Sequence, residues 1–204
     1  MIAWASSDGR EENGGVQLPA ASTIKLFVAS AFWRSGLDPD EPAPVEPTPF
    51  SLSDRLTATL TLGDLALLAL AVSDNAATNV LIDRLGFDAV NGEIERLGLE
   101  RTVLRRKMIA DGPENLTCAR DLAHGLAALA GEERIVGAMA LAQDSLLPGL
   151  LPGSAVAVKS GELDGVYHEA ALVDGLGVAV CSSPAASRAE IARIAQGISL
   201  KRGG

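Results

Sequence analysis

A change of hydrophobic period near Pro152-Gly153 constrains the fold of this chain more than any other feature of its sequence. Before this point the apolar residues recur at helical spacing, which predicts helices over residues 61–71, 76–85, 88–97, 117–129 and 132–147. After it, apolar runs separated by Gly-containing turns predict a three-strand meander at residues 155–159, 166–173 and 176–181. An amphipathic pattern over residues 187–200 predicts a closing helix.

The beginning of the chain has extended character as well. Residues 2–7 predict a short strand, Asp8-Gly9 a turn and residues 14–18 a second strand, so we expect a hairpin there. Strands at both ends of the chain with helices between them predict an α+β fold. In such a fold, an antiparallel sheet is built from both chain ends and an all-helical subdomain is inserted into it.

The same layout predicts the division of the chain into subdomains. We expect the sheet and the closing helix to comprise residues 1–19 and 154–204, and the helical subdomain to comprise residues 20–153, with an active site between them. Prolines at five positions between 38 and 49 exclude a helix interior, so this segment is expected to be an extended surface connector outside the core. The polar segment 100–116 is expected to be a surface loop.

Two helix starts carry capping signals. Thr61 and Asp64 have the spacing of a capping box at the start of the helix predicted over 61–71. Thr117 is the expected N-cap of the next long helix after the polar loop. Both assignments follow from a side-chain oxygen that can accept a hydrogen bond from a free backbone N–H in the first turn.

Composition narrows the classes of partner. The net charge of −9 argues against binding of nucleic acid or of an anionic membrane. The longest uncharged apolar run, residues 65–72, is too short to span a membrane, and no signal peptide is recognisable. As it stands, the sequence therefore predicts a soluble, cytoplasmic chain. We also expect a monomer. Cys118 and Cys181 lack metal-ligand spacing and are interpreted as buried thiols rather than a disulfide. The two histidines are also isolated, so no metal site and no cofactor are expected.

A serine and a lysine lie three residues apart at the start of an apolar helix. Pro19 precedes this helix, and Ser35-Gly36 is expected to end it. Residues three apart on a helix face the same way, so the Lys25 amine can reach the Ser22 hydroxyl. A serine hydroxyl becomes a useful nucleophile when a neighbouring base takes its proton, and the spacing supplies such a base.

Two further motifs follow. Residues 73–75 read Ser-Asp-Asn on a loop between two predicted helices, and residues 159–161 read Lys-Ser-Gly at the end of a predicted strand. With Ser22 and Lys25, and in this order, they resemble the active site of class A β-lactamases and the related penicillin-recognising serine peptidases. The flanking segments 19–25 and 73–79 resemble the same family beyond the motif letters. The resemblance implies a β-lactamase-like fold.

The resemblance also implies catalytic roles. Ser22 would be the acylated nucleophile, Lys25 its base or proton relay, and Ser73 the group that passes the proton to the leaving nitrogen. Lys159 would contact the Ser73 hydroxyl. We expect the pKa of Lys25 to be lowered, because Lys159 is a like charge nearby and the site should be partly desolvated.

Other positions would bind the substrate. Asn75 would bond the side-chain amide of the substrate, and Lys159 with Ser160 would face its carboxylate. Gly161 would let the strand backbone approach the substrate closely. The backbone N–H groups of Ser22 and Glu162 would form the oxyanion hole.

Three features depart from the family pattern. Met108 occupies the position where class A enzymes carry the glutamate that activates the deacylating water, and Glu114 is the candidate to replace it. His168 stands where many of these enzymes present an arginine to the substrate carboxylate. It would either bind a carboxylate when protonated or pack on the strand. No helix is predicted before the first strand.

The resulting hypothesis is a β-lactamase-like serine hydrolase that forms an acyl-enzyme on Ser22 and turns over β-lactams weakly or deacylates slowly. A D-alanyl-D-alanine peptidase or an esterase shares the nucleophile set and needs no such glutamate. A β-lactam-binding or sensing module that acylates once is the alternative outside enzymes. Glutaminases of related fold share the first and third motifs but lack the Ser-Asp-Asn loop. In each case the expected partner is a small molecule: a β-lactam, an ester or a peptide.

Overall fold

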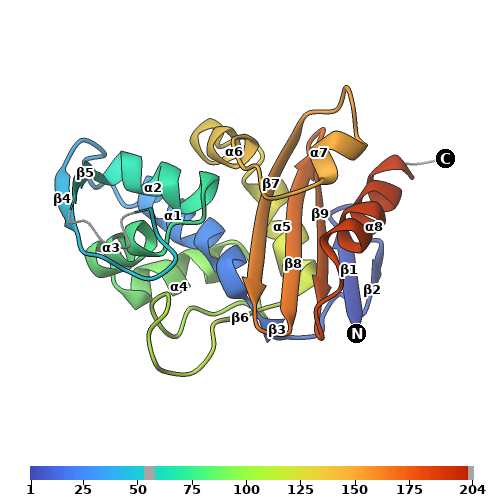
Figure 1. Cartoon of the computed structure of the whole chain (residues 1–204), viewed down its shortest axis with the longest axis horizontal. Coiled ribbons are helices and arrows are strands. Elements are labelled where there is room, and N and C mark those ends of the chain that lie inside the picture. Colours follow the sequence, from blue (N-terminus) through green and yellow to red (C-terminus); the bar gives the residue numbers. More distant parts are fainter. Residues whose placement is uncertain (53–57, 202–204) are drawn as a thin grey trace.

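A computed structural model describes residues 1–52 and 58–201. Within these residues, an antiparallel sheet is built from both ends of the chain, with strand order β2-β1-β9-β8-β7 (Figure 1). The strands are β1 (Ile2–Ser6), β2 (Glu11–Glu12), β7 (Val156–Leu163), β8 (Val166–Val173) and β9 (Leu176–Ser182). The register pairs Ile2 with Ser182, so the first strand is held by the last one. The predicted meander and the sheet made from both chain ends are confirmed.

Helices cover both faces of this sheet. Helix α8 (Arg188–Leu200), capped by the Ser187 side chain, packs on one face, and α7 (Leu147–Leu150) lies beside it (Figure 1). Helix α5 (Ala119–Ala128) packs on the other face against β1, β8 and β9. A Cβ at Gly177 would lie 2.1 Å from the Ala123 carbonyl oxygen, so only glycine allows α5 to approach β9 this closely.

The helical part of the molecule surrounds α1 (Lys25–Arg34), which is buried along nearly all of its length. It packs against α2 (Leu62–Ala71), α3 (Asn75–Leu85), α4 (Phe87–Arg96) and α6 (Glu133–Ala140). Large apolar side chains on these helices, such as Phe27, Phe32 and Leu65, have essentially no exposed surface. This packing fixes the start of α1 and the loop between α2 and α3 relative to each other. The helix predictions for α1 to α4 are confirmed to within a few residues.

The capping box predicted for Thr61 and Asp64 is present at the start of α2, with both reciprocal hydrogen bonds. The prediction for Thr117 is wrong, because this residue belongs to β6 (Leu116–Thr117) and Cys118 caps α5. Pairing of β6 with β3 (Leu18–Pro19) holds Thr117 in an extended conformation. A long-range strand pair thus overrides a local capping signal.

Two extended segments differ from prediction. The strand that pairs with β1 is Glu11–Glu12, whereas residues 14–18 contribute no strand to that hairpin. The proline-rich connector contains β4 (Pro42–Val45), which pairs with β5 (Ala58–Thr61). Its prolines alternate on the exposed side, so Ala43 and Val45 can face the core, and both are buried. Part of this segment is therefore a core element.

The helix predicted over 132–147 is also too long. Helix α6 ends at Ala140, and the chain then turns so that Asp144 reaches the edge of β7. In the segment 100–116, predicted as a surface loop, Leu104 and Met108 are buried, and Val103 bridges to Leu116. The proposed division at residues 19 and 154 stays a prediction.

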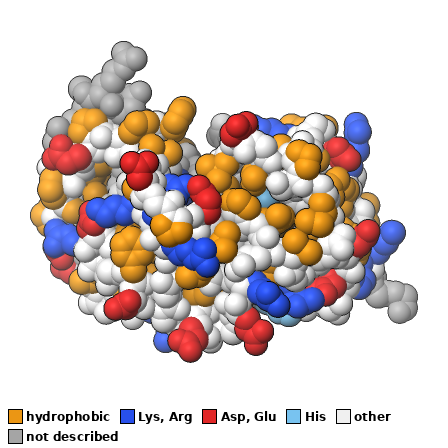
Figure 2. Space-filling model, turned by 90° about the horizontal axis from the view of Figure 1, so that it is seen from below, with side chains coloured by type: hydrophobic (Ala, Val, Ile, Leu, Met, Phe, Trp, Pro, Cys, Tyr) orange, Lys and Arg blue, Asp and Glu red, His pale blue; other side chains and the backbone are white. Residues whose placement is uncertain are grey.

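Several further expectations can be compared with the structure. Cys118 and Cys181 are buried free thiols, as interpreted from the sequence. No helix among the described residues is long and apolar enough to cross a membrane. On the face seen in Figure 2, acidic and basic side chains are interspersed among apolar ones.

Candidate active site

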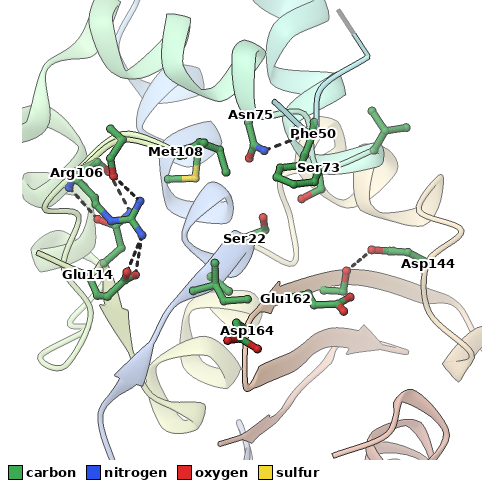
Figure 3. A pocket seen from close by; sticks show the side chains of 17 residues that line it. Ser22, Phe50, Ser73, Asn75, Arg106, Met108, Glu114, Asp144, Glu162 and Asp164 are labelled. Carbon is green, nitrogen blue, oxygen red and sulfur yellow. Dashed lines mark hydrogen bonds and ion pairs between the residues drawn. The ribbon is translucent and has the colours of Figure 1, made fainter. Parts of the chain in front are cut away.

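A cavity of about 690 Å³ lies where the helical part meets the edge of β7. The lining residues come from the start of α1, the loop before α3, the segment 106–115 and the β7–β8 hairpin. They are Ala21, Ser22, Phe50, Val72, Ser73, Asn75, Arg106, Met108, Ile109, Ala110, Glu114, Asn115, Asp144, Ser160, Glu162, Leu163 and Asp164. All three predicted motifs therefore contribute to one cavity, with Ser22 near its centre in Figure 3.

Ser22 is positioned by a short 3₁₀ helix, Ala21–Ile24, that leads into α1. Its backbone lies directly against β7, since a Cβ on Gly161 would be 3.0 Å from the nitrogen atoms of both Ser22 and Thr23. Such a contact is tighter than a methyl group tolerates. The glycine predicted from the third motif thus allows the strand to approach the backbone of the candidate nucleophile.

The Lys25 side chain is completely buried, and its amine points toward the loop before α3. Its Nζ donates to the backbone carbonyl of Ser73, to Ser73 Oγ at 3.2 Å and to Asn75 Oδ1 at 2.8 Å. Burial, and then the charge of Lys159, hold the pKa of Lys25 well below its usual value, whereas Asp74 opposes this shift. The predicted direction is confirmed. Among the hydrogen bonds of the described residues, none joins Lys25 to Ser22 Oγ.

Ser73 lies between α2 and α3 with a left-handed backbone, φ +58°. This conformation is unfavourable for serine and is often found at functional sites, where the surrounding structure maintains it. Asp74 anchors the loop, since its carboxylate accepts from Ala77 N at 2.8 Å and from Leu52 N at 2.8 Å. The loop thereby presents the Ser73 hydroxyl to two lysines.

Lys159 extends from β7 toward the same hydroxyl. Its Nζ donates to Ser73 Oγ at 3.0 Å and to the Ser160 carbonyl at 2.7 Å. Burial lowers the pKa of Lys159 to about 8, against an opposing effect of Asp144. The two lysines therefore meet at one serine hydroxyl, and each is easier to deprotonate than a lysine in water.

Asn75 is fully engaged within the protein. Its Oδ1 accepts from Lys25, and its Nδ2 donates to the carbonyl oxygens of Pro49 at 3.2 Å and Phe50 at 3.3 Å. From the same segment, Ser51 Oγ accepts a hydrogen bond from the backbone N–H of Ala76. The segment 49–52 thus covers the amide that was predicted to bind substrate, and Phe50 is 85% exposed at the cavity. The sequence interpretation gave this segment no role.

Met108 lines the cavity on the side opposite β7 (Figure 3). Asn79 holds its backbone with two hydrogen bonds: Met108 N donates to Oδ1 at 2.7 Å, and Nδ2 donates to the Met108 carbonyl at 3.1 Å. Glu114, the predicted substitute for a glutamate here, is paired with Arg106 through both carboxylate oxygens at 2.7 and 2.8 Å. A thioether therefore faces the cavity, and the neighbouring carboxylate is bound to a guanidinium.

His168 lies behind β7 rather than in the cavity. It is fully buried, with Nε2 2.8 Å from the Pro19 carbonyl oxygen and Nδ1 accepting from Ser182 N at 3.3 Å. Burial also lowers its pKa, which favours the neutral ring. Of the two roles left open by the sequence, this geometry favours packing on the strand over contact with a substrate in the cavity.

Asp144 also lines the cavity, although the sequence motifs assign it no role. The carboxylate of Asp144 accepts a hydrogen bond from Ser160 Oγ, at the point where β7 borders the cavity. Asp144 falls in the segment 132–147, predicted as a helix, and no local pattern marks it as a partner of β7. Among the described residues, no group of three or more His, Cys, Asp or Glu side chains is placed to hold a metal ion.

Comparison with known proteins assigns the family. The sequence pattern of the β-lactamase enzyme family matches residues 5–200. This chain belongs to the β-lactamase enzyme family. Its fold is that of the class A enzymes, since it superposes on the class A β-lactamase from Mycobacterium abscessus with a TM-score of 0.85 at 20% identity, covering 100% of this chain and 94% of that one. No match is found among curated proteins.

Two other solved structures are similar to this chain over nearly its whole length. The β-lactamase from Sphaerobacter thermophilus is 26% identical, with a TM-score of 0.81, covering 98% of this chain and 88% of that one. PBP-A is 25% identical, with a TM-score of 0.81 and the same coverage. The similar solved structures thus include proteins named as β-lactamases and one named PBP-A.

Proposed function

We propose that this protein is an active-site serine hydrolase that reacts through an acyl-enzyme on Ser22. The observation that carries the proposal is the convergence at one cavity of Ser22 with a hydroxyl, Ser73 Oγ, contacted by both Lys25 and Lys159. Because the pKa of the buried Lys25 amine is lowered, this amine is deprotonated more readily than a lysine in water and can act as a base. A solved neighbour, a single-residue mutant of PBP-A, is an acyl-enzyme complex with penicillin G, which supports the same intermediate here.

Acylation would proceed in two stages. Ser22 Oγ attacks the substrate carbonyl while its proton passes to the neutral Lys25 amine. The tetrahedral oxyanion is stabilised by the N–H groups of Ser22 and Glu162. The bond from the carbonyl carbon to the leaving nitrogen or oxygen then breaks, and that atom receives a proton through Ser73, whose hydroxyl lies 3.2 Å from Lys25 Nζ and 3.0 Å from Lys159 Nζ. Lys159 keeps positive charge beside this transfer.

Near Met108, the described residues offer no evident base for deacylation. Met108 faces the cavity with a thioether, which accepts a proton too weakly to activate water. Glu114 is held by Arg106. The acyl-enzyme is therefore expected to persist, and β-lactam turnover to be weak or slow. This observation also favours a second candidate function, a β-lactam-binding or sensing module that acylates once.

A panel of acyl donors tests the proposal: penicillin G, nitrocefin, a D-Ala-D-Ala peptide and phenyl phenylacetate. Intact-protein mass spectrometry should show one acyl group, and peptide mapping should locate it on Ser22. Ser22→Ala should abolish the adduct, whereas Ser35→Ala, a hydroxyl on the far end of α1, should leave it unchanged. A burst of one equivalent without turnover would favour the sensing module. Turnover of the ester or peptide alone would favour an esterase or peptidase. Absence of any adduct on Ser22 would refute the proposal.

A further inference from the structure

The wall of the cavity along β7 is acidic. Asp144, Glu162 and Asp164 all line the cavity there, and Figure 3 shows them on the β7 side of Ser22. Asp144 comes from the loop after α6, whereas the other two belong to the end of β7 and the turn that follows. Carboxylates from two separate parts of the chain therefore face the position of a bound substrate.

Few positive charges balance this wall. Among the described residues that line the cavity, Arg106 carries the only basic side chain, and Glu114 binds it through both oxygens. Arg188 pairs with Glu162 at 2.7 Å from outside the cavity. Lys25 and Lys159 are buried and donate to acceptors of the protein. An anionic group of a substrate would thus find no unpaired arginine or lysine in the described lining.

Asp144 also accepts the hydrogen bond of a hydroxyl group that an anionic group of a substrate would need as its donor. Ser160 Oγ donates its hydrogen bond to the Asp144 carboxylate, and a serine hydroxyl has one proton to donate. A substrate carboxylate at this position would have to displace Asp144 and would lie close to a like charge. Like charges a few ångströms apart repel strongly near a protein surface.

We propose that Asp144 biases the substrate preference of this site, by slowing acylation from donors that carry a carboxylate on the β7 side of the scissile bond and favouring neutral or cationic donors. The inference rests on the proposed acylation of Ser22. Asp144 acts here as a specificity-determining residue, because its carboxylate contacts Ser160 rather than the reacting atoms. A cationic leaving group would be attracted chiefly by Asp144 and Asp164, because Glu162 is paired with Arg188.

Three phenyl esters of phenylacetic acid, identical in the acyl group, test this inference. The leaving phenol carries a carboxylate, a methyl ester or a trimethylammonium group at its 3-position. In each reaction the Ser22 Oγ–acyl bond forms, the bond from the acyl carbon to the phenol oxygen breaks, and the phenol leaves. Acylation rates are measured by intact mass for the wild type and for Asp144→Asn. Each ester has the same intrinsic reactivity with both proteins. A change in the ratio of two esters' acylation rates between the wild type and Asp144→Asn therefore reports the effect of the Asp144 side chain alone.

Removal of the Asp144 charge should raise the rate of the carboxylate ester about tenfold relative to the methyl ester, and lower that of the trimethylammonium ester several-fold. Asp88→Asn, the same change of charge on the exposed surface of α4, should leave the ratios unchanged. Because Asp144 is itself exposed, its substitution should preserve the fold. In the wild type, 1 M salt should also narrow the gap between the carboxylate and methyl esters.

The outcomes separate the two proposals. Acylation of Ser22 with ratios that do not differ between the wild type and Asp144→Asn would overturn the inference about Asp144 alone. A carboxylate ester that reacts as fast as the methyl ester in the wild type, independently of salt, would do the same. Absence of acylation by all three esters would overturn the proposed function and this inference with it.

Discussion

The two sides of the cavity differ in what they offer to a reaction. On the side of α1 and β7, the buried amines of Lys25 and Lys159 and the Ser73 hydroxyl form a continuous polar network. On the side of the segment 106–115, Met108 presents a thioether, and the carboxylate of Glu114 is paired with Arg106. Groups that transfer protons are thus concentrated where an acyl-enzyme would form. This difference is the basis for proposing that an acyl-enzyme forms on Ser22 but is hydrolysed slowly.

The polar side should be the more sensitive one. Lys25→Arg keeps a positive charge but removes the base, because a guanidinium is not deprotonated in proteins. We expect the rate of Ser22 acylation to fall about 10³-fold, within the range for loss of a general base. Intact-mass kinetics measure this rate, and circular dichroism checks the fold. Acylation at the normal rate would contradict the role of Lys25.

A substitution at Met108 can give the apolar side of the cavity a general base. Met108→Glu would place a carboxylate at a backbone position that Asn79 already fixes with two hydrogen bonds. We expect the deacylation rate to rise about 100-fold, because a general base can then activate water. The decay of the acyl-enzyme mass after removal of excess donor gives this rate. Met108→Gln has nearly the same shape but no base, and should deacylate like the wild type; an equal gain from glutamine would exclude general-base catalysis.

The close contact between β7 and the start of α1 should have a smaller effect on the acylation rate. Gly161→Ala adds a methyl group 3.0 Å from the backbone nitrogen of Ser22, so β7 and the start of α1 must separate by a few tenths of an ångström. We expect acylation to slow about tenfold, since small displacements of reacting groups are costly. Gly92→Ala, where a new Cβ has open space on a helix, serves as the control. Equal effects of both substitutions on the rate would contradict a positioning role of Gly161.

The smallest expected effect on the acylation rate is that of a change in pH. The pKa of Lys159 is lowered to about 8, so its positive charge is present below this value and is lost as the pH rises through it. If that charge supports proton transfer at Ser73, acylation should fall about fivefold between pH 8 and pH 9, following the protonated fraction. Lys159→Arg keeps the charge at all these pH values and should remove the decline. Persistence of the decline in this variant would assign it to another group.

Local patterns predicted the fold well where residues close in sequence determine the structure. The meander at 156–182, the capping box of α2 and the start of α1 each follow from short-range spacing, and the structure contains all three. The convergence of the three motifs was predicted from the family resemblance rather than from periodicity. Its geometry nonetheless agrees, since Ser22, Ser73 and Ser160 line the same cavity.

Features that depend on distant partners were not predictable. The β4 strand is stabilised by β5 and by burial of Ala43, although its prolines indicate a loop. Asp144 leaves the expected helix because Ser160 and the edge of β7 bind it. The role of Asn79 is similar, since its amide is matched to a backbone position 29 residues away at Met108. Each interaction joins segments whose proximity only the tertiary structure establishes.

The pairing of Ile2 with Ser182 has a consequence for biosynthesis. During translation β1 emerges first but must wait for β9, and the β7 edge of the cavity is made only shortly before β9. A ribosome-bound chain that stops before residue 156 would therefore contain Ser22, Lys25 and Ser73 without their sheet partner. Ser22 should therefore acquire its proposed reactivity only after β7 to β9 have been made, because long-range strand pairing is completed last.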